Sequence, residues 1–175
     1  GVTSSTANTS WDDMSNGGAL AYEYAITTSA TRPTSGTSTT ATFYAASGLL
    51  PQTVYYLHVR SSCTGGTFGN WSTVSFTTAC AEVTSFIQNF DAVTTPAFPN
   101  CWFKVGTTGT VNTQNSSSSS TPNCLYIYGT SATNQAIVRT IPVSNLGAGT
   151  NRFKFKMRAN FTVGGILELG YLTNP

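Results

Sequence analysis

The chain has 175 residues, of which eight are Lys or Arg and six are Asp or Glu, so its formal net charge is only +2. So few charged side chains cannot cover the surfaces of several α-helices, whereas abundant Thr, Val, Tyr and Phe favour half-buried β-strands. The small charge argues against a nucleic-acid-binding protein. No apolar run approaches the roughly 20 residues of a membrane span. We therefore expect an all-β protein, of a length that suggests two domains.

Short alternating segments, separated by Gly, Asn, Pro and Ser clusters, predict strands in the first half of the chain. We expect these strands at 5–12, 19–28, 38–45, 53–62 and 71–79.

The predicted strand at 53–62 contains the only histidine of the chain. Its period of two places Tyr55, Leu57 and Val59 on the core face. His58 then points outward, and we expect it to be exposed to solvent or to lie at an interface. A catalytic base needs partners that such a position does not supply.

The second half shows similar patterns and a polar low-complexity run. We expect strands at 85–91, 101–106, 124–129, 136–143, 152–159 and 165–172. The run at 114–123 is predicted to be a surface loop. No segment keeps a 3.6-residue period, so we expect no long helix.

Four cysteines, at positions 63, 80, 101 and 124, lack the paired C-x-x-C spacing of a zinc site. Disulfides in an exported protein are the better interpretation. The candidates are Cys63, Cys80, Cys101 and Cys124, and three connectivities remain open.

Residues 1–80 resemble a fibronectin type III domain. The residues that carry the resemblance are Leu49, Pro51, Thr53 and Tyr55, which match an L-x-P-x-T-x-Y signature, together with Trp11 and the segment "WSTVSFTT" that begins at Trp71. The resemblance implies a seven-stranded sandwich in which the ring of Tyr55 is buried and its hydroxyl returns to nearby backbone. The first strand is incomplete in this comparison.

Residues 81–175 resemble the beginning of a MAM-like jelly roll of the choice-of-anchor J, or cleaved-adhesin, type. The segment "FIQNFDAVTTPAFPNCWFKV", which includes Trp102, carries this resemblance. Such domains need roughly 150 residues to close two sheets, so we expect the chain to be part of a longer polypeptide. The pair of domains is similar to large surface adhesins that gliding bacteria export by the type IX secretion route.

Few residues suggest catalysis or a cofactor. The six acids are scattered, so we expect no carboxylate-pair active site. No glycine-rich loop precedes a predicted helix, which argues against a phosphate site. The resemblance suggests a structural calcium ion at Asp91, and the simpler interpretation is that Asp91 caps a turn.

Two strands offer candidate ligand-binding faces. In 152–159, Arg152, Lys154, Lys156 and Arg158 share one side, which suits an acidic glycan or another anionic surface polymer. The simpler interpretation is a solvated strand face whose other side, with Phe153, Phe155 and Met157, fills the core. In 124–129, Tyr126 and Tyr128 share a side. Exposed, they suit sugar stacking, but a packed core row is the interpretation we favour.

These observations predict a non-enzymatic, extracellular segment of a cell-surface adhesin, with a spacer domain and a domain that contacts a glycan or a protein. One alternative is an accessory binding module of a secreted glycosidase or peptidase. Another is a cargo protein captured by the type IX secretion machinery. No nucleic-acid partner, membrane insertion or catalytic residue is expected.

Overall fold

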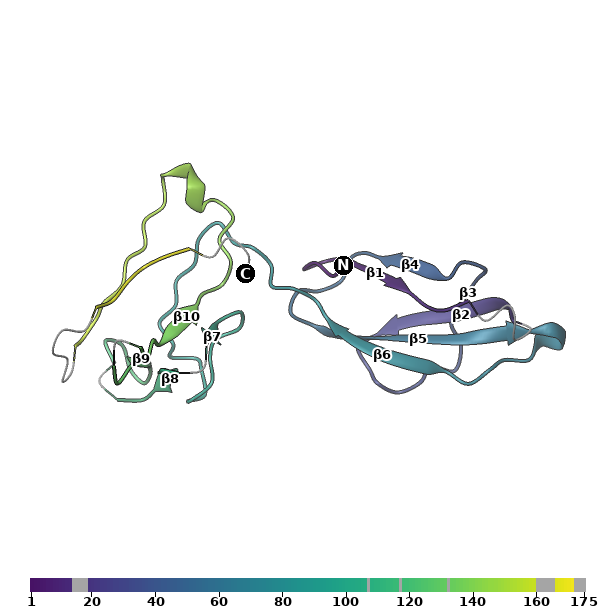
Figure 1. Cartoon of the computed structure of the whole chain (residues 1–175), viewed down its shortest axis with the longest axis horizontal. Helices are drawn as coiled ribbons and strands as arrows, with labels where there is room; N and C mark the ends of the chain where they lie inside the picture. Colours follow the sequence, from purple (N-terminus) through teal and green to yellow (C-terminus); the bar gives the residue numbers. More distant parts are fainter. Residues whose placement is uncertain (14–18, 107, 117, 132, 160–165, 172–175) are drawn as a thin grey trace.

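The computed structural model describes residues 1–13, 19–106, 108–116, 118–131, 133–159 and 166–171. Strands β1 to β6 gather in one lobe and β7 to β10 in a second lobe, with a single connector between them (Figure 1). All paired strands are antiparallel. No α-helix occurs within these residues, only two short 3-10 turns at Thr64–Gly66 and Leu146–Ala148. The predicted β-rich class is thus confirmed.

The first lobe contains a four-stranded and a two-stranded sheet. The larger sheet has the order β3 (Thr37–Thr39), β2 (Ala19–Thr27), β5 (Val54–Cys63) and β6 (Ser72–Thr77). The smaller sheet pairs β1 (Ala7–Ser10) with β4 (Phe43–Ala46). Strands β3 and β4 replace the single strand expected at 38–45. Between them Thr39 Oγ1 accepts the N–H of Ala41 at 3.0 Å, which turns the chain from one sheet to the other.

Aromatic side chains fill the space between these two sheets. Trp11, just after β1, lies 6.1 Å from Tyr22 and 5.9 Å from Tyr24, measured between ring centres. Tyr24 also lies 4.4 Å from Tyr44 of β4. Edge-to-face and offset arrangements of this kind stabilise a core beyond the area that they bury. Trp11 is half-buried beside these rings.

The core face of β5 also follows the prediction. Tyr55 and Leu57 are 8% and 4% exposed. The backbone N–H of Leu50 donates to the Tyr55 hydroxyl at 2.9 Å, which is the return contact expected for this tyrosine. The Thr78 hydroxyl donates to the Leu50 carbonyl at 2.6 Å and accepts the N–H of Thr53 at 2.9 Å. The turn before β5 is therefore fastened to the end of β6.

The opposite face of β5 is covered as well, so the prediction that His58 is exposed is wrong. His58 is 0% exposed. Its Nδ1 atom lies 2.9 Å from Thr73 Oγ1, and its Nε2 atom lies 3.2 Å from both Thr27 Oγ1 and the Ser29 carbonyl. Since a carbonyl only accepts, Nε2–H is the donor to Ser29, and in a neutral imidazole of this tautomer Nδ1 accepts from the Thr73 hydroxyl. The cause is the segment 28–36 between β2 and β3, which crosses this face of the sheet.

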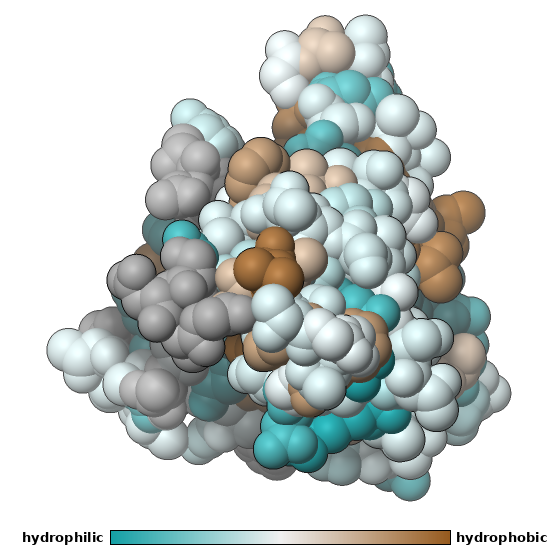
Figure 2. All heavy atoms as spheres, turned by 90° about the vertical axis from the view of Figure 1, so that its right-hand side faces the viewer, coloured by the Kyte–Doolittle hydropathy of each residue, from teal (hydrophilic) through white to brown (hydrophobic). Residues whose placement is uncertain are grey.

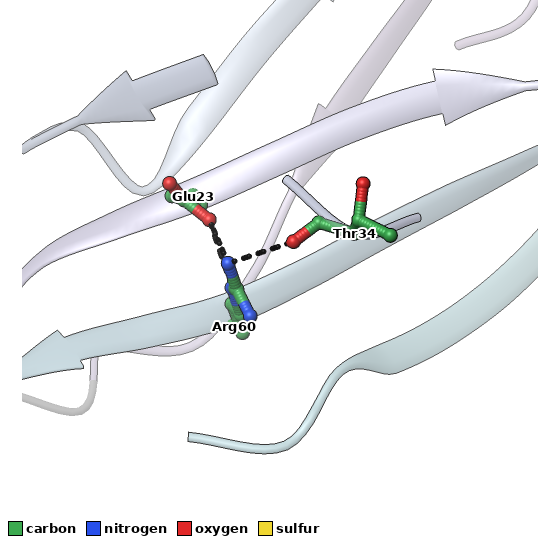
Figure 3. A network of polar contacts seen from close by, with 3 residues as sticks. All are labelled: Glu23, Thr34 and Arg60. Atoms are coloured by element: carbon green, nitrogen blue, oxygen red, sulfur yellow. Dashed lines mark hydrogen bonds and ion pairs between the residues drawn. The ribbon is translucent and has the colours of Figure 1, made fainter. Parts of the chain in front are cut away.

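An ion pair lies under the same segment (Figure 3). Glu23 Oε2 accepts from Arg60 at 2.6 Å (Nη2) and 2.8 Å (Nε), and Nη2 also donates to the Thr34 carbonyl at 3.4 Å. The guanidinium lies 4.1 Å from the centre of the Phe68 ring and 4.5 Å from that of Trp71. The two charged side chains are only 15% and 10% exposed. Around Glu23 and Arg60, the outer face of the larger sheet is therefore packed as well.

The second lobe is built from two antiparallel pairs. Strand β7 (Phe103–Val105) pairs with β10 (Ile137–Arg139), and β8 (Thr110–Gln114) pairs with β9 (Cys124–Tyr128). Strand β8 was not predicted. In β8, buried side chains alternate with more exposed ones, and the buried ones are Val111 and Thr113, which are 5% and 1% exposed. The Thr113 hydroxyl donates to the Ala97 carbonyl at 2.6 Å, so a polar residue satisfies its hydrogen bond inside the lobe.

Three strand predictions in this half are wrong for the residues described. Residues 85–91, 152–159 and 166–171 form no strand, and the rest of 165–172 lies outside the described residues. At 85–91, side chains take up backbone N–H groups that a strand would use to pair with its neighbour. Gln88 Oε1 accepts the N–H of Phe90 at 2.7 Å, and Asn89 Oδ1 accepts the N–H of Asp91 at 3.2 Å. Such local bonds form turns instead of strands.

The second lobe has a small aromatic core beside a disulfide. Trp102 is 7% exposed, and the rings of Phe86 and Phe90 meet it edge to face at 6.0 and 5.3 Å. The adjacent residue, Cys101, is bonded to Cys80. This bond supplies the pairing that the sequence left open.

The other two cysteines do not form the second disulfide considered from the sequence. Cys63 and Cys124 are free, half-buried thiols.

The end of the first lobe shows apolar side chains scattered among polar ones (Figure 2). Single apolar side chains on the surface are normal in folded proteins. No helix in the described part of the chain is long and apolar enough to cross a membrane.

Candidate functional site

The connector between the lobes is anchored on both sides. On the side of the first lobe, the N–H of Ala79 donates to the Thr3 carbonyl at 3.0 Å, and the Ala79 carbonyl accepts the N–H of Gln52 at 3.1 Å. The next residue, Cys80, is bonded to Cys101 of the second lobe. The chain therefore passes from one anchored residue to another within a single peptide unit. We call residues 79–83 the junction.

A second set of contacts holds the junction to the other lobe. The N–H of Val83 donates to the Pro142 carbonyl, and the N–H of Ser144 donates to the Val83 carbonyl, both at 3.0 Å. Val83 and Val143 form an isolated parallel bridge. The junction is thus fixed both to the start of β7, through the disulfide, and to the segment that follows β10.

The four candidate cations lie on a fully exposed segment. Residues 151–159, which contain Arg152, Lys154, Lys156 and Arg158, are all exposed and belong to no strand. The prediction that the alternate side chains fill the core is wrong: Phe153, Phe155 and Met157 are 53%, 51% and 66% exposed. The physical reason is that no described strand pairs with this segment, so nothing covers either side. The segment therefore exposes cations and aromatic rings together.

Asp91 holds a loop in place. Its carboxylate accepts from Asn89 Nδ2 at 2.8 Å, from Ser120 Oγ at 3.4 Å and from the N–H of Asn123 at 3.4 Å. The buried Asn123 side chain donates to the Val93 carbonyl at 2.7 Å. This carboxylate is surrounded by hydrogen-bond donors of the loop. The described residues around Asp91 therefore fit the turn-capping interpretation, and a calcium ion at Asp91 stays a prediction.

Tyr126 and Tyr128 do not form the packed row that we favoured. They are 36% and 50% exposed, and their rings lie 6.1 Å apart with 19° between their planes. This aromatic pair is open to solvent on β9.

A shallow groove of about 500 Å³ opens between β3 and β4, with the rings of Tyr24 and Tyr44 along it. Burial, followed by the neighbouring phenol of Tyr44, raises the pKa of Tyr24 above the ordinary value for tyrosine. No charged side chain lines the groove.

The remaining structural candidates differ in burial. Leu49 is half-buried, Pro51 is exposed, and Trp71 and Trp102 are buried. Trp71 covers Arg60 on the outer face of the larger sheet, although the resemblance placed it simply in the last strand.

No cluster of three or more His, Cys, Asp or Glu side chains occurs in the part of the chain that the structure describes.

The buried His58 is expected to stabilise the first lobe. Replacing it with Phe keeps much of the volume but removes the hydrogen bonds of the imidazole to the Thr73 hydroxyl and to the Ser29 carbonyl, which keeps only the Thr27 hydroxyl as a donor. We expect the free energy of unfolding to fall by about 2 kcal/mol, measured by urea denaturation. Ser75→Ala, on the exposed strand β6, is the matched control and should change stability by less than about 0.5 kcal/mol. An equally small effect of His58→Phe would show that the contacts of the imidazole do not stabilise this lobe.

No protein-family model matches the chain, and neither a curated protein nor a solved structure matches it. The case for a function therefore rests on the residues and contacts above.

Proposed function

We propose that this chain is a non-catalytic segment of an exported cell-surface adhesin. The first lobe, a fibronectin type III-like sandwich, is the spacer. The second lobe, the beginning of a MAM-like jelly roll, contacts a glycan or a protein. The single observation that carries the proposal is the junction, where an anchored residue of one lobe is followed directly by a disulfide to the other.

A spacer in an adhesin must transmit tension without lengthening. A flexible linker extends under load by up to about 3.5 Å per residue before it transfers force. The junction has no such slack, because Ala79 and Cys80 are held by different lobes. The disulfide also suits an oxidising, extracellular setting.

The packing of the first lobe supports the same role. Segment 28–36 is tied to the outer face of its larger sheet through His58 and Arg60. A long loop fastened in this way cannot extend independently of the sheet. The buried polar groups thus make the first lobe rigid. Among the described residues, the partners of His58 are hydroxyl and carbonyl groups, and none is a carboxylate.

The cationic segment is the first candidate for the contact role. Arg152, Lys154, Lys156 and Arg158 are all exposed. We expect them to attract an acidic glycan, with an affinity that falls as salt rises. The charge balance favours this lobe: residues 81–175 contain six Lys or Arg against three acids, whereas residues 1–80 contain two against three.

A glycan array tests this contact. The fourfold variant Arg152→Ser, Lys154→Ser, Lys156→Ser and Arg158→Ser should lose most binding to sulfated and uronic-acid glycans at 50 mM salt, roughly tenfold or more. Arg32→Ser, an exposed cation of the first lobe, is the control and should bind as the parent chain does. Unchanged binding by the fourfold variant would exclude this segment as the contact.

Two other functions remain proposals of lower rank. The same pair of lobes would suit an accessory module of a secreted glycosidase or peptidase, or a cargo of the type IX secretion machinery. The sequence of the parent polypeptide separates these possibilities. Catalytic signatures beside this segment would favour the accessory module, and repeated sandwich domains with a terminal secretion domain would favour the adhesin.

A further inference from the structure

We infer that the solvent side of the β8 and β9 pair binds a neutral oligosaccharide. This side, the tyrosine face, consists of residues that lie opposite one another in the two strands. They are Thr110, Asn112 and Gln114 of β8 with Tyr128, Tyr126 and Cys124 of β9. The inference rests on the proposed contact role of the second lobe, and it names a ligand class and a site different from the cationic segment.

The two sides of the pair differ most clearly on β8. Val111 and Thr113 of β8 are 5% and 1% exposed and point into the lobe, whereas Ile127 of β9, opposite Val111, is 40% exposed. The alternate residues must therefore point to the other side of the pair. On that side Tyr126 and Tyr128 are 36% and 50% exposed. Their position is thus a consequence of strand register and not of a distorted strand.

The geometry of the two rings suits a sugar chain. The ring centres are 6.1 Å apart and the planes differ by 19°. Nearly parallel, exposed aromatic rings offer apolar surface with a polar hydroxyl at the tip. The C–H-rich faces of pyranose rings are apolar in the same way, while their hydroxyls need hydrogen-bond partners. The exposed surface of this stacked tyrosine pair can pack against an apolar sugar face.

An exposed polar neighbour can supply those hydrogen bonds. Thr110 lies opposite Tyr128 and is exposed. Its hydroxyl can donate to one sugar hydroxyl and accept from another. Asn112 lies opposite Tyr126, but it is half-buried and its Oδ1 atom is buried, so this oxygen does not face a ligand.

The face also excludes the ligand proposed for the cationic segment. None of its six residues is Asp, Glu, Lys, Arg or His. A uronic acid or a sulfate would lose hydration here without meeting an opposite charge, which costs free energy. A neutral hexopyranose chain has no such cost. The ligand class is therefore a neutral oligosaccharide, and its binding should be insensitive to salt.

The test uses the whole chain and three neutral hexasaccharides, built from β-1,4-linked glucose, β-1,4-linked N-acetylglucosamine and α-1,6-linked mannose. Affinity is measured by isothermal titration calorimetry, and NMR of the tyrosine ring protons locates the site. We expect at least one sugar to bind and to shift the signals of Tyr126 and Tyr128. Tyr126→Ala and Tyr128→Ala should each weaken it roughly tenfold.

Two controls separate ring contact from general damage. Tyr126→Phe keeps the ring and should bind within about threefold of the parent chain. Tyr171→Ala removes a tyrosine that is 78% exposed elsewhere in this half and should change nothing. Failure of all three sugars to bind at millimolar concentration would overturn the inference, as would full affinity in both alanine variants. Neither result would contradict the proposed spacer role, because that role is tested by a separate measurement on the junction.

Discussion

Replacing Arg60 with Ala is expected to lower the free energy of unfolding of the first lobe by about 3–5 kcal/mol. The change removes both contacts to Glu23 and the two ring contacts. It leaves a carboxylate that is only 10% exposed without its partner. Because an unpaired charge in such a position is costly, the loss should far exceed that of a surface salt bridge.

Urea denaturation measures this loss, and hydrogen exchange of the β2 amides assigns it to the first lobe. Arg32→Ala, an exposed cation of segment 28–36, is the matched control and should cost less than about 0.5 kcal/mol. The double variant Glu23→Leu with Arg60→Met should recover most of the loss, since it removes both charges. A loss below about 1 kcal/mol in Arg60→Ala would mean that the pair is no more than a surface contact.

Removal of the junction disulfide is expected to destabilise the second lobe. The bond joins residues 21 apart in sequence, and closing a loop of this size stabilises a protein by about 3 kcal/mol. The variant Cys80→Ser with Cys101→Ser should therefore lower the melting temperature of the second lobe and leave that of the first almost unchanged. Calorimetry resolves the two transitions.

A matched control comes from the other two cysteines. Cys63→Ser with Cys124→Ser changes two free thiols and should alter neither transition appreciably. Equal melting temperatures for both double variants would show that the bond contributes nothing to the stability of the lobe.

The features that the sequence predicts correctly are those set by short-range pattern. The period of two in β5 places Tyr55 and Leu57 in the core. The return of the Tyr55 hydroxyl to nearby backbone, which the structure has at Leu50, is what the fibronectin type III resemblance implies. Alternation, turn chemistry and one aromatic anchor lie within a few residues of one another. No distant contact is needed to derive them.

The burial of His58 depends on distant contacts and could not be derived in this way. A strand pattern shows which residues share a face but not what later covers that face. Here the covering segment is the connection between β2 and β3, which has no periodicity of its own. The sequence offers one signal, the length of that connection, about nine residues. The structure adds that Glu23 on β2 lies directly opposite Arg60. A carboxylate facing a guanidinium indicates a face with a defined structure.

The second half shows a different failure. At 85–91 the apolar alternation predicts a strand, yet Asn89 and Asp91 form local side-chain bonds, and Phe90 has a φ of 66°. A positive φ interrupts a strand. At 152–159 the alternation is present, but a strand also needs a neighbour to pair with. The pairing of the cysteines could not be predicted either, because the spacing of four cysteines is compatible with three connectivities.

Single-molecule force spectroscopy tests the load-bearing junction most directly, with the chain pulled from its two ends. In the oxidised protein, once residues 151–159, which belong to no strand, have straightened, the next extension event should be the unfolding of a whole lobe, because Ala79 and Cys80 are held on opposite sides of one peptide unit. In the Cys80→Ser and Cys101→Ser variant, a step of roughly 70 Å should appear at lower force, as the residues between these positions straighten. A low-force lengthening of the junction in the oxidised protein, before either lobe unfolds, would contradict the account.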